Sequence, residues 1–201
     1  GAAVREAAPQ LMLTPGIHAA YEQGVAQLVD QPGVSLVAKG KATGHLACPC
    51  QPHLLRTSAS DFIGNAALHD EVFGACALIV ECDSVAQMQQ VLTALEGQLT
   101  ATVHLEEADY ALADQLLPLL ERRAGRILFN GWPTGVEVCH SMVHGGPWPS
   151  TSDSRTTSVG SAAIQRFLRP VCYQAMPEAL APDSLKADNP LGLPRQVNGK
   201  R

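Results

Sequence analysis

Six cysteines and seven histidines are the side chains of this 201-residue sequence that could supply a nucleophile or bind a metal ion. Two of the cysteines form the Cys48-Pro49-Cys50 pair, in which one residue separates the thiols instead of the two of a zinc knuckle. No second pair follows it at a zinc-binding spacing. We therefore interpret Cys48 and Cys50 as loop thiols without a catalytic role, and we predict no metal site.

A Cys–His nucleophile or a metal site is the alternative reading for Cys139, His140 and His144. Adjacent side chains in an extended segment point to opposite faces, so Cys139 and His140 cannot easily share a proton. The Gly145-Gly146 pair that follows is too short for a phosphate loop, and the sequence contains neither a G-x-G-x-x-G nor a Walker motif. Residue types alone therefore identify no catalytic residue.

The elements that could position a functional site lie in the stretch from Glu71 to Asn130. From the spacing of the residues alone, we interpret Glu71 as a solvated residue in front of a strand. Apolar runs and helical stripes alternate through the stretch, which predicts an α/β fold with one mainly parallel sheet flanked by helices. Ligands bind at the carboxyl ends of such strands, so Asn130 and the loop behind it are of interest. The predicted strands are 75–80, 100–105 and 126–130, and the predicted helices are 84–96, capped by Ser84, and 109–123.

The flanking sequence predicts shorter elements. Thr14 and Pro15 form a typical helix start, and the helix continues to about Val29. Residues 131–152 contain several glycines and prolines, and structureless loops of this length are often functional. The other predicted elements are strands at 34–38, 53–58 and 171–174, a loop at 40–52, a short turn capped by Asp61, and a helix at 161–168.

The composition is that of an ordinary globular protein, with 46% hydrophobic and 16% charged residues. The net charge of -5 gives no basic field that would attract nucleic acid or an anionic membrane. No apolar run approaches the roughly 20 residues that cross a bilayer. The cysteines form no regular framework, so we expect reduced thiols and a cytoplasmic location. The sequence begins with Gly1 instead of methionine, and we expect it to be a fragment.

The segment Glu71-Val72-Phe73-Gly74, followed by a strand, a helix and a second strand, resembles the cofactor-contacting segment of the aldehyde dehydrogenase superfamily. Ala75 stands where a proline is common in that family. Phe129-Asn130 and the later Val143-His144-Gly145-Gly146 resemble its asparagine strand and its Pro-Phe-Gly-Gly segment. The tract from residue 129 to 155 most resembles the branch that oxidises α-ketoglutaric semialdehyde. The resemblance covers residues 13–174, and it makes residues 1–169 the C-terminal part of a catalytic domain.

The resemblance also implies roles for residues. In this family a cysteine thiolate attacks the aldehyde, NAD or NADP takes the hydride, and a glutamate helps water to release the acid. Glu71 would hold the nicotinamide ribose hydroxyls, because a carboxylate can accept from two neighbouring OH groups, and Phe73 would pack beside the nicotinamide. His144 would line the aldehyde pocket, and Arg155 would suit a substrate that ends in a carboxylate.

The nucleophile of the family belongs to a Gly-Gln-x-Cys segment, which this sequence does not contain. The resemblance implies that this cysteine and most of the cofactor site precede residue 1, so we assign no catalytic residue here and expect the fragment alone to be inactive. Residues 170–201 would form a terminal strand and tail, an arm that joins a homo-oligomer by covering a sheet edge. The alternative is a non-catalytic assembly or binding domain with the same fold.

Overall fold

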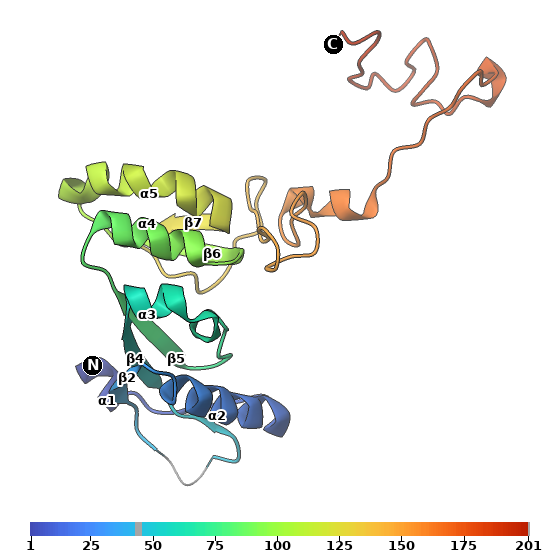
Figure 1. Cartoon of the computed structure of the whole chain (residues 1–201). Helices are drawn as coiled ribbons and strands as arrows, with labels where there is room; N and C mark the ends of the chain where they lie inside the picture. Colours follow the sequence, from blue (N-terminus) through green and yellow to red (C-terminus); the bar gives the residue numbers. More distant parts are fainter. Residues whose placement is uncertain (43–45, 201) are drawn as a thin grey trace. The chain divides into compact units, whose positions relative to one another are not determined.

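The computed structural model describes residues 1–42 and 46–200, and it divides into two compact units, Gly1–Ala163 and Ile164–Arg201 (Figure 1). Part of the predicted loop 40–52, at positions 43–45, lies outside the described residues. None of the described helices is long and apolar enough to cross a membrane. The α-helices are α1 (Ala2–Glu6), α2 (Pro15–Val29), α3 (Ala59–Gly64), α4 (Val85–Ala94) and α5 (Tyr110–Arg123). The strands are β1 (Gln10–Leu11), β2 (Ser35–Lys39), β3 (Pro49–Cys50), β4 (His53–Ser58), β5 (Cys76–Glu81), β6 (Gln98–Val103) and β7 (Ala124–Phe129). Short 3-10 helices are η1 (Ala66–Leu68), η2 (Glu107–Asp109), η3 (Ser161–Phe167) and η4 (Glu178–Leu180).

Hydroxyl side chains begin three of these helices. The Thr14 hydroxyl accepts a hydrogen bond from the Ile17 amide and the Ser84 hydroxyl accepts one from the Gln87 amide, both at 3.2 Å, which confirms the predicted starts of α2 and α4. The prediction of a short turn capped by Asp61 was wrong, because this segment is the helix α3. Ser58 caps α3, because its hydroxyl accepts from the Asp61 amide at 3.1 Å and donates to the Asp61 carboxylate at 2.7 Å.

The strands of the described residues form three small sheets. In the largest, the order is β2-β4-β5, with β4 and β5 parallel and β2 antiparallel to β4. Strands β6 and β7 form a separate parallel pair. Strand β3, inside the region 40–52 that was predicted as a loop, pairs antiparallel with β1. The α/β class and the parallel direction were predicted correctly. The prediction that β5, β6 and β7 share one sheet was wrong, because β5 pairs with β4 and β6 pairs with β7.

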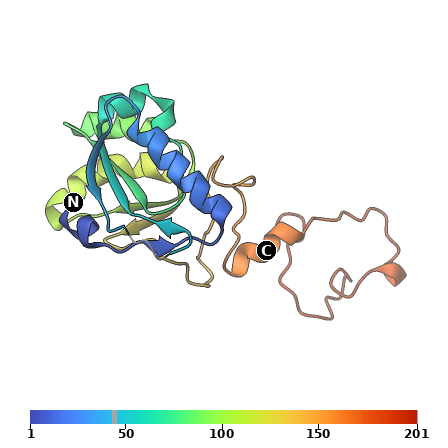
Figure 2. The same cartoon turned by 90° about the horizontal axis from the view of Figure 1, so that it is seen from below.

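Alternation along β4 places one face of the largest sheet in the core. His53, Leu55 and Thr57 are buried, whereas Arg56 and Ser58 between and after them are exposed. Helix α2 lies along this sheet (Figure 2). The core consists of two clusters of buried residues. The first is Met12, Tyr21, Val25, Cys48 and Cys50, and the second is Leu28, Leu55, Phe62 and Leu68.

Helices α4 and α5 pack against each other, and α4 also packs against α3 (Figure 1). Helix α4 has no fully buried residue, although Val91 and Leu95 pack against the second core cluster. Arg123 at the end of α5 joins the two helices, since its guanidinium donates to the carbonyl oxygens of Leu92 at 3.2 Å and Thr93 at 2.6 Å. These oxygens belong to the last turn of α4, where carbonyl groups lack intrahelical partners.

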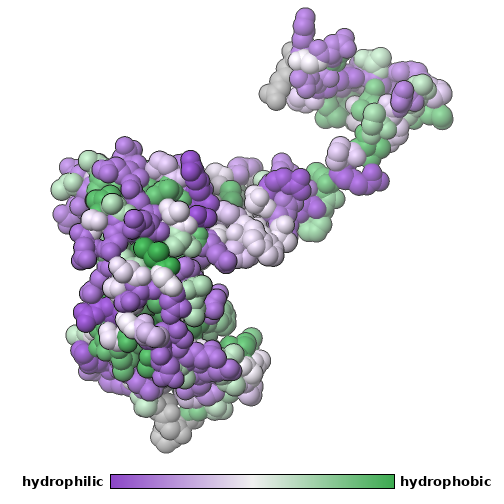
Figure 3. Space-filling model, viewed as in Figure 1, coloured by the Kyte–Doolittle hydropathy of each residue, from purple (hydrophilic) through white to green (hydrophobic). Residues whose placement is uncertain are grey.

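The second unit contains little regular structure. The predicted helix at 161–168 is the 3-10 helix η3, and the predicted strand at 171–174 was wrong, because these residues join no strand in this single chain. Figure 3 shows apolar side chains at the surface of this unit. Phe167 is 85% exposed and Leu180 is 72% exposed, so the unit lacks a core of its own in the described residues. The predicted oligomerisation arm stays a prediction.

Candidate functional site

A groove of about 1080 Å³ within the first unit brings two of the four predicted site residues together. Its walls come from β5, from the end of α4, from the first half of β6, and from the irregular segments 133–136 and 149–150. Both Glu71 and His144 line it, although 72 residues separate them in the sequence. Phe73 and Arg155 are not among its lining residues.

Glu71 lies on a segment that is fixed by its neighbour. Val72 packs against both core clusters, whereas the side chains on either side of it are exposed, including Phe73 at 68%. Gly74 then turns with a φ of +151°, and a side chain at this position would collide with the ring of Tyr21. Within residues 1–42 and 46–200, no hydrogen bond or ion pair engages the Glu71 carboxylate. It is therefore available to a ligand.

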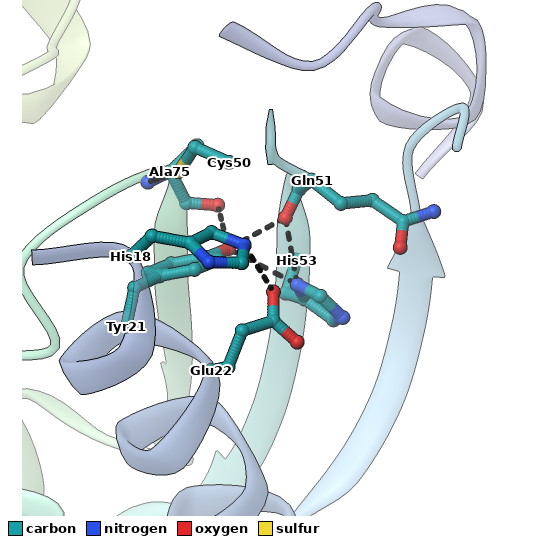
Figure 4. Close-up of polar contacts among 7 residues, drawn as sticks. All are labelled: His18, Tyr21, Glu22, Cys50, Gln51, His53 and Ala75. Carbon is teal, nitrogen blue, oxygen red and sulfur yellow. Dashed lines mark hydrogen bonds and ion pairs between the residues drawn. The ribbon is translucent and has the colours of Figure 1, made fainter. Parts of the chain in front are cut away.

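A buried polar cluster supports the turn at Gly74 (Figure 4). The Tyr21 hydroxyl lies 2.5 Å from the carbonyl oxygen of Gln51, 3.1 Å from Nδ1 of His53 and 3.3 Å from the carbonyl oxygen of Ala75. The Ala75 amide donates to Sγ of Cys50 at 3.1 Å. Both backbone groups of Ala75 are thus held directly after the turn, and the Tyr21 ring blocks the space beside Gly74.

Burial sets the protonation of this cluster. It raises the pKa of Tyr21 well above its usual value, with the nearby Cys50 acting in the same direction. It lowers the pKa of His53 and raises the pKa of Cys76, because the charged forms of both groups lose their hydration. Neutral side chains therefore occupy this cluster near pH 7, as expected for a structural support.

The sequence analysis did not identify this cluster, and the interpretation of Cys48 and Cys50 as thiols without a catalytic role stays a prediction. Cys48 and Cys50 are both buried in the first core cluster, and Cys50 belongs to the short strand β3. Among the described residues, no group of three or more His, Cys, Asp or Glu side chains could hold a metal ion. Nothing in the sequence joins Tyr21, Cys50 and His53, because they come from α2, β3 and β4.

His144 is fixed through its backbone. Its amide donates to the Thr157 hydroxyl at 2.8 Å, and its carbonyl oxygen accepts from the Ser158 amide at 3.0 Å. Gly145 and Gly146 after it are buried. A side chain at Gly146, where φ is +156°, would collide with the carbonyl oxygen of Gln98. The two glycines therefore let this loop cross the start of β6 and β7, and His144 faces the groove from that position.

Arg155 is engaged elsewhere. Its Nε and Nη2 donate to the two carboxylate oxygens of Asp153, at 3.0 and 3.2 Å, and this pairing raises the pKa of Arg155. The side chain is 87% exposed. Arg126, which the sequence analysis did not select, does line the groove, and its Nη1 donates to the Gly135 carbonyl oxygen at 2.7 Å. Its Nε is buried without a partner in the described part of the chain. The sequence feature that could have identified Arg126 is a single arginine within an otherwise apolar strand.

Comparison with solved structures places this fold among aldehyde dehydrogenases. Betaine aldehyde dehydrogenase of Staphylococcus aureus matches with a TM-score of 0.60 at 14% identity, over 78% of this chain and 29% of that one. Lactaldehyde dehydrogenase of Escherichia coli matches with a TM-score of 0.60 at 18% identity, over 79% of this chain and 30% of that one. Likenesses at this identity establish the fold. No protein-family model matches the chain.

Comparison with curated proteins adds a relationship in sequence. The chain is 50% identical over 190 residues to alpha-ketoglutaric semialdehyde dehydrogenase 2 of Azospirillum brasilense, which is 94% of this chain and 36% of that protein. It is 50% identical over 196 residues to alpha-ketoglutaric semialdehyde dehydrogenase of Acinetobacter baylyi, which is 97% of this chain and 37% of that protein. The chain is thus similar in sequence to alpha-ketoglutaric semialdehyde dehydrogenases and similar in fold to aldehyde dehydrogenases. It spans little more than a third of the length of these two relatives.

Proposed function

We propose that this chain is part of an NAD(P)-dependent enzyme that oxidises α-ketoglutaric semialdehyde to α-ketoglutarate. The observation that carries the proposal is the 50% identity, over nearly the whole chain, to two proteins with that name. The chain matches little more than a third of each, so the complete reaction belongs to a longer protein. The cysteine nucleophile would lie in the part of that protein outside residues 1–201.

Glu71 is the residue of this chain that we propose for cofactor binding. NAD(P)⁺ would supply the hydride acceptor of the reaction. An exposed carboxylate that has no partner among the described residues suits two adjacent ribose hydroxyls, since it can accept both hydrogen bonds. The turn at Gly74 and the packing of Val72 hold the backbone beside it, so that binding has to order only the Glu71 side chain. Phe73 is exposed beside it and would offer an apolar face to the nicotinamide.

His144 and Arg155 are the residues that we propose for substrate binding. His144 lies in the groove, with its backbone fixed from both sides. Arg155 would bind the carboxylate of the substrate. To do so, its guanidinium must release the Asp153 carboxylate. The support for Arg155 is therefore the chemistry of a bidentate guanidinium and not its position.

A homo-oligomer and a cytoplasmic location are further parts of the proposal. The exposed apolar side chains of the second unit, such as Phe167 and Leu180, need a surface that covers them. This observation also favours the alternative function, a non-catalytic assembly domain. All six cysteines carry free thiols, which supports a reducing compartment. The small aldehyde would be the other partner.

The test is an assay of the protein encoded by the complete reading frame that contains this chain. Production of NADH or NADPH with α-ketoglutaric semialdehyde supports the enzyme, and a correctly folded protein without such activity supports the assembly domain. Glu71→Gln should slow the hydride step by about one to two decades, if a charge-assisted hydrogen bond of about 1.5–3 kcal/mol acts mainly in the transition state. Glu121→Gln, on an exposed site of α5, is the control and should leave the rate unchanged.

A further inference from the structure

We propose that Tyr21 and Gly24 of α2 are positioning residues for cofactor binding, because they hold the segment 71–75 on its core side and thereby place the Glu71 carboxylate. The inference rests on the proposed role of Glu71 in binding the ribose hydroxyls. It adds two residues that act on the cofactor only through Glu71, without touching it.

Glu71 depends on its backbone for its position. Its side chain is exposed, and no hydrogen bond or ion pair from the described part of the chain engages its carboxylate. A carboxylate that accepts from two adjacent hydroxyls must lie within hydrogen-bond distance of both, so a small displacement weakens the contact. Whatever holds the backbone of the segment 71–75 therefore sets how well Glu71 can bind a ligand.

Helix α2 contacts this segment at two points, one on each side of Phe73. A methyl group added at Gly24 would lie 3.2 Å from Cγ1 of Val72, and one added at Gly74 would collide with the ring of Tyr21. Tyr21 and Gly24 are three residues apart and so lie on the same face of the helix. The close approach at both points leaves the backbone between Val72 and Gly74 little room to move toward α2.

Tyr21 is itself fixed. It is 1% exposed, so its ring cannot turn out of the core, and Figure 4 shows its hydroxyl among polar groups. The hydroxyl contacts the carbonyl oxygens of Gln51 and Ala75 and Nδ1 of His53. The Ala75 contact reaches the segment directly, and Sγ of Cys50 accepts from the amide of the same residue at 3.1 Å. The hydroxyl therefore joins the end of the segment to α2 and to β4.

Gly24 indicates that the position of the segment matters beyond the stability of α2. A glycine in the interior of a helix is less favourable than an alanine, and Gly24 lies ten residues into a 15-residue helix. The close approach of Val72 is what an alanine at this position would disturb. Gly24 therefore lowers the stability of the helix and permits Val72, the neighbour of Glu71, to pack against it.

Nucleotide binding to the protein from the complete reading frame tests the proposal. The probe is NADH or NADPH, whichever the wild type binds more tightly, titrated by its fluorescence without aldehyde. Tyr21→Phe keeps the ring and removes the hydroxyl, and it should raise the dissociation constant about three- to tenfold, the range of one uncharged hydrogen bond. In a Glu71→Gln background the same change should alter the dissociation constant by less than about twofold, because Tyr21 acts through Glu71. KM for the aldehyde should stay unchanged in Tyr21→Phe.

A pair of glycine variants in α2 tests the positioning without touching the polar cluster. Gly24→Ala forces Val72 to shift and should raise the same dissociation constant at least about threefold. Gly16→Ala is the matched control, because the added methyl group meets the Thr14 hydroxyl at 3.9 Å, an ordinary van der Waals distance. It should leave nucleotide binding unchanged.

The outcomes separate this inference from the proposed function. An unchanged dissociation constant in both Tyr21→Phe and Gly24→Ala would overturn the inference while the role of Glu71 stands, as would an equal effect of Tyr21→Phe in the wild-type and Glu71→Gln backgrounds. A wild type that binds neither nucleotide, or a Glu71→Gln protein that binds as the wild type does, would contradict the proposed role of Glu71 and overturn this inference with it.

Discussion

The side-chain amide of Asn130 binds both backbone groups of Leu105. Its Oδ1 accepts from the Leu105 amide at 2.8 Å, and its Nδ2 donates to the Leu105 carbonyl oxygen at 2.9 Å. Asn130 also adopts a left-handed φ of 52°, which ends β7. The side chain therefore continues the pairing of β6 and β7 by one step beyond the strands. Asn130 therefore has a structural role, and its predicted position near a bound ligand stays a prediction.

Replacement of Asn130 should destabilise the first unit. Asn130→Ala removes two hydrogen bonds and places an alanine at positive φ, so we expect a loss of about 1–3 kcal/mol in the free energy of unfolding. Asn130→Gly tolerates the same φ and separates the two causes, because it loses the hydrogen bonds alone. Urea unfolding measures both variants. Equal stability of Asn130→Ala and the wild type would show that the bonds to Leu105 contribute nothing.

Replacement of Tyr21 should lower the free energy of unfolding by a similar amount, through a different mechanism. Tyr21→Phe keeps the buried ring against Gly74 but leaves the polar groups around it without their hydroxyl partner. Loss of a partner for buried polar groups costs about 1–3 kcal/mol. Tyr110→Phe on α5 is the control, since Tyr110 is 58% exposed and should give no change. Thermal melting distinguishes the two variants.

The low pKa of His53 predicts a pH dependence of stability. Burial depresses its pKa in the folded state, so the unfolded state binds more protons in the window below the ordinary value of 6.5. The free energy of unfolding should therefore fall as the pH falls from about 7 through 6.5, until His53 is also protonated in the folded state. His53→Gln should flatten this part of the profile, and His140→Gln, at an exposed position, should not. A parallel slope in wild type and His53→Gln would assign the effect to other groups.

Thiol labelling should follow burial. Cys172 is exposed, whereas Cys50 is 5% exposed and burial raises the pKa of Cys76. Brief treatment with iodoacetamide at neutral pH should modify Cys172 first and leave Cys48, Cys50 and Cys76 unmodified until the protein unfolds. Mass spectrometry of the peptides gives the order. Early modification of Cys50 would contradict its burial in the first core cluster.

Features that depend on neighbouring residues could be predicted from the sequence, and features that join distant segments could not. Thr14 and Ser84 lie three residues before the amides that they cap, so the pattern revealed both helix starts. The strand at His53–Ser58 was predicted with its bounds, from its own residues. The partner of β5, by contrast, is set by β4 some 23 residues earlier, and alternation of elements predicts only that a parallel partner exists.

The candidate site shows the same division. Glu71 and His144 were selected through the resemblance, and the fold places them in one groove. Phe73 follows Val72, and because Val72 faces the core, Phe73 faces away from it, a direction that the motif alone does not give. Arg155 was selected for its charge, but a sequence cannot show that Asp153, two residues earlier, already binds it through both carboxylate oxygens.

The last prediction concerns the substrate roles of His144 and Arg155 in the complete enzyme. If Arg155 binds the substrate carboxylate, Arg155→Gln should raise KM for α-ketoglutaric semialdehyde by about two- to fivefold, the range of an exposed ion pair, and leave KM for a neutral aldehyde such as propanal unchanged. His144→Ala should raise KM for both aldehydes, because a side chain that lines the groove contacts either of them. Asp153→Asn is the informative control. It removes a charge that competes for the guanidinium, so it should lower KM for the acidic aldehyde and leave the neutral one unaffected. If Arg155→Gln changes neither KM, the pair with Asp153 is a feature of the surface and Arg155 is removed from the site.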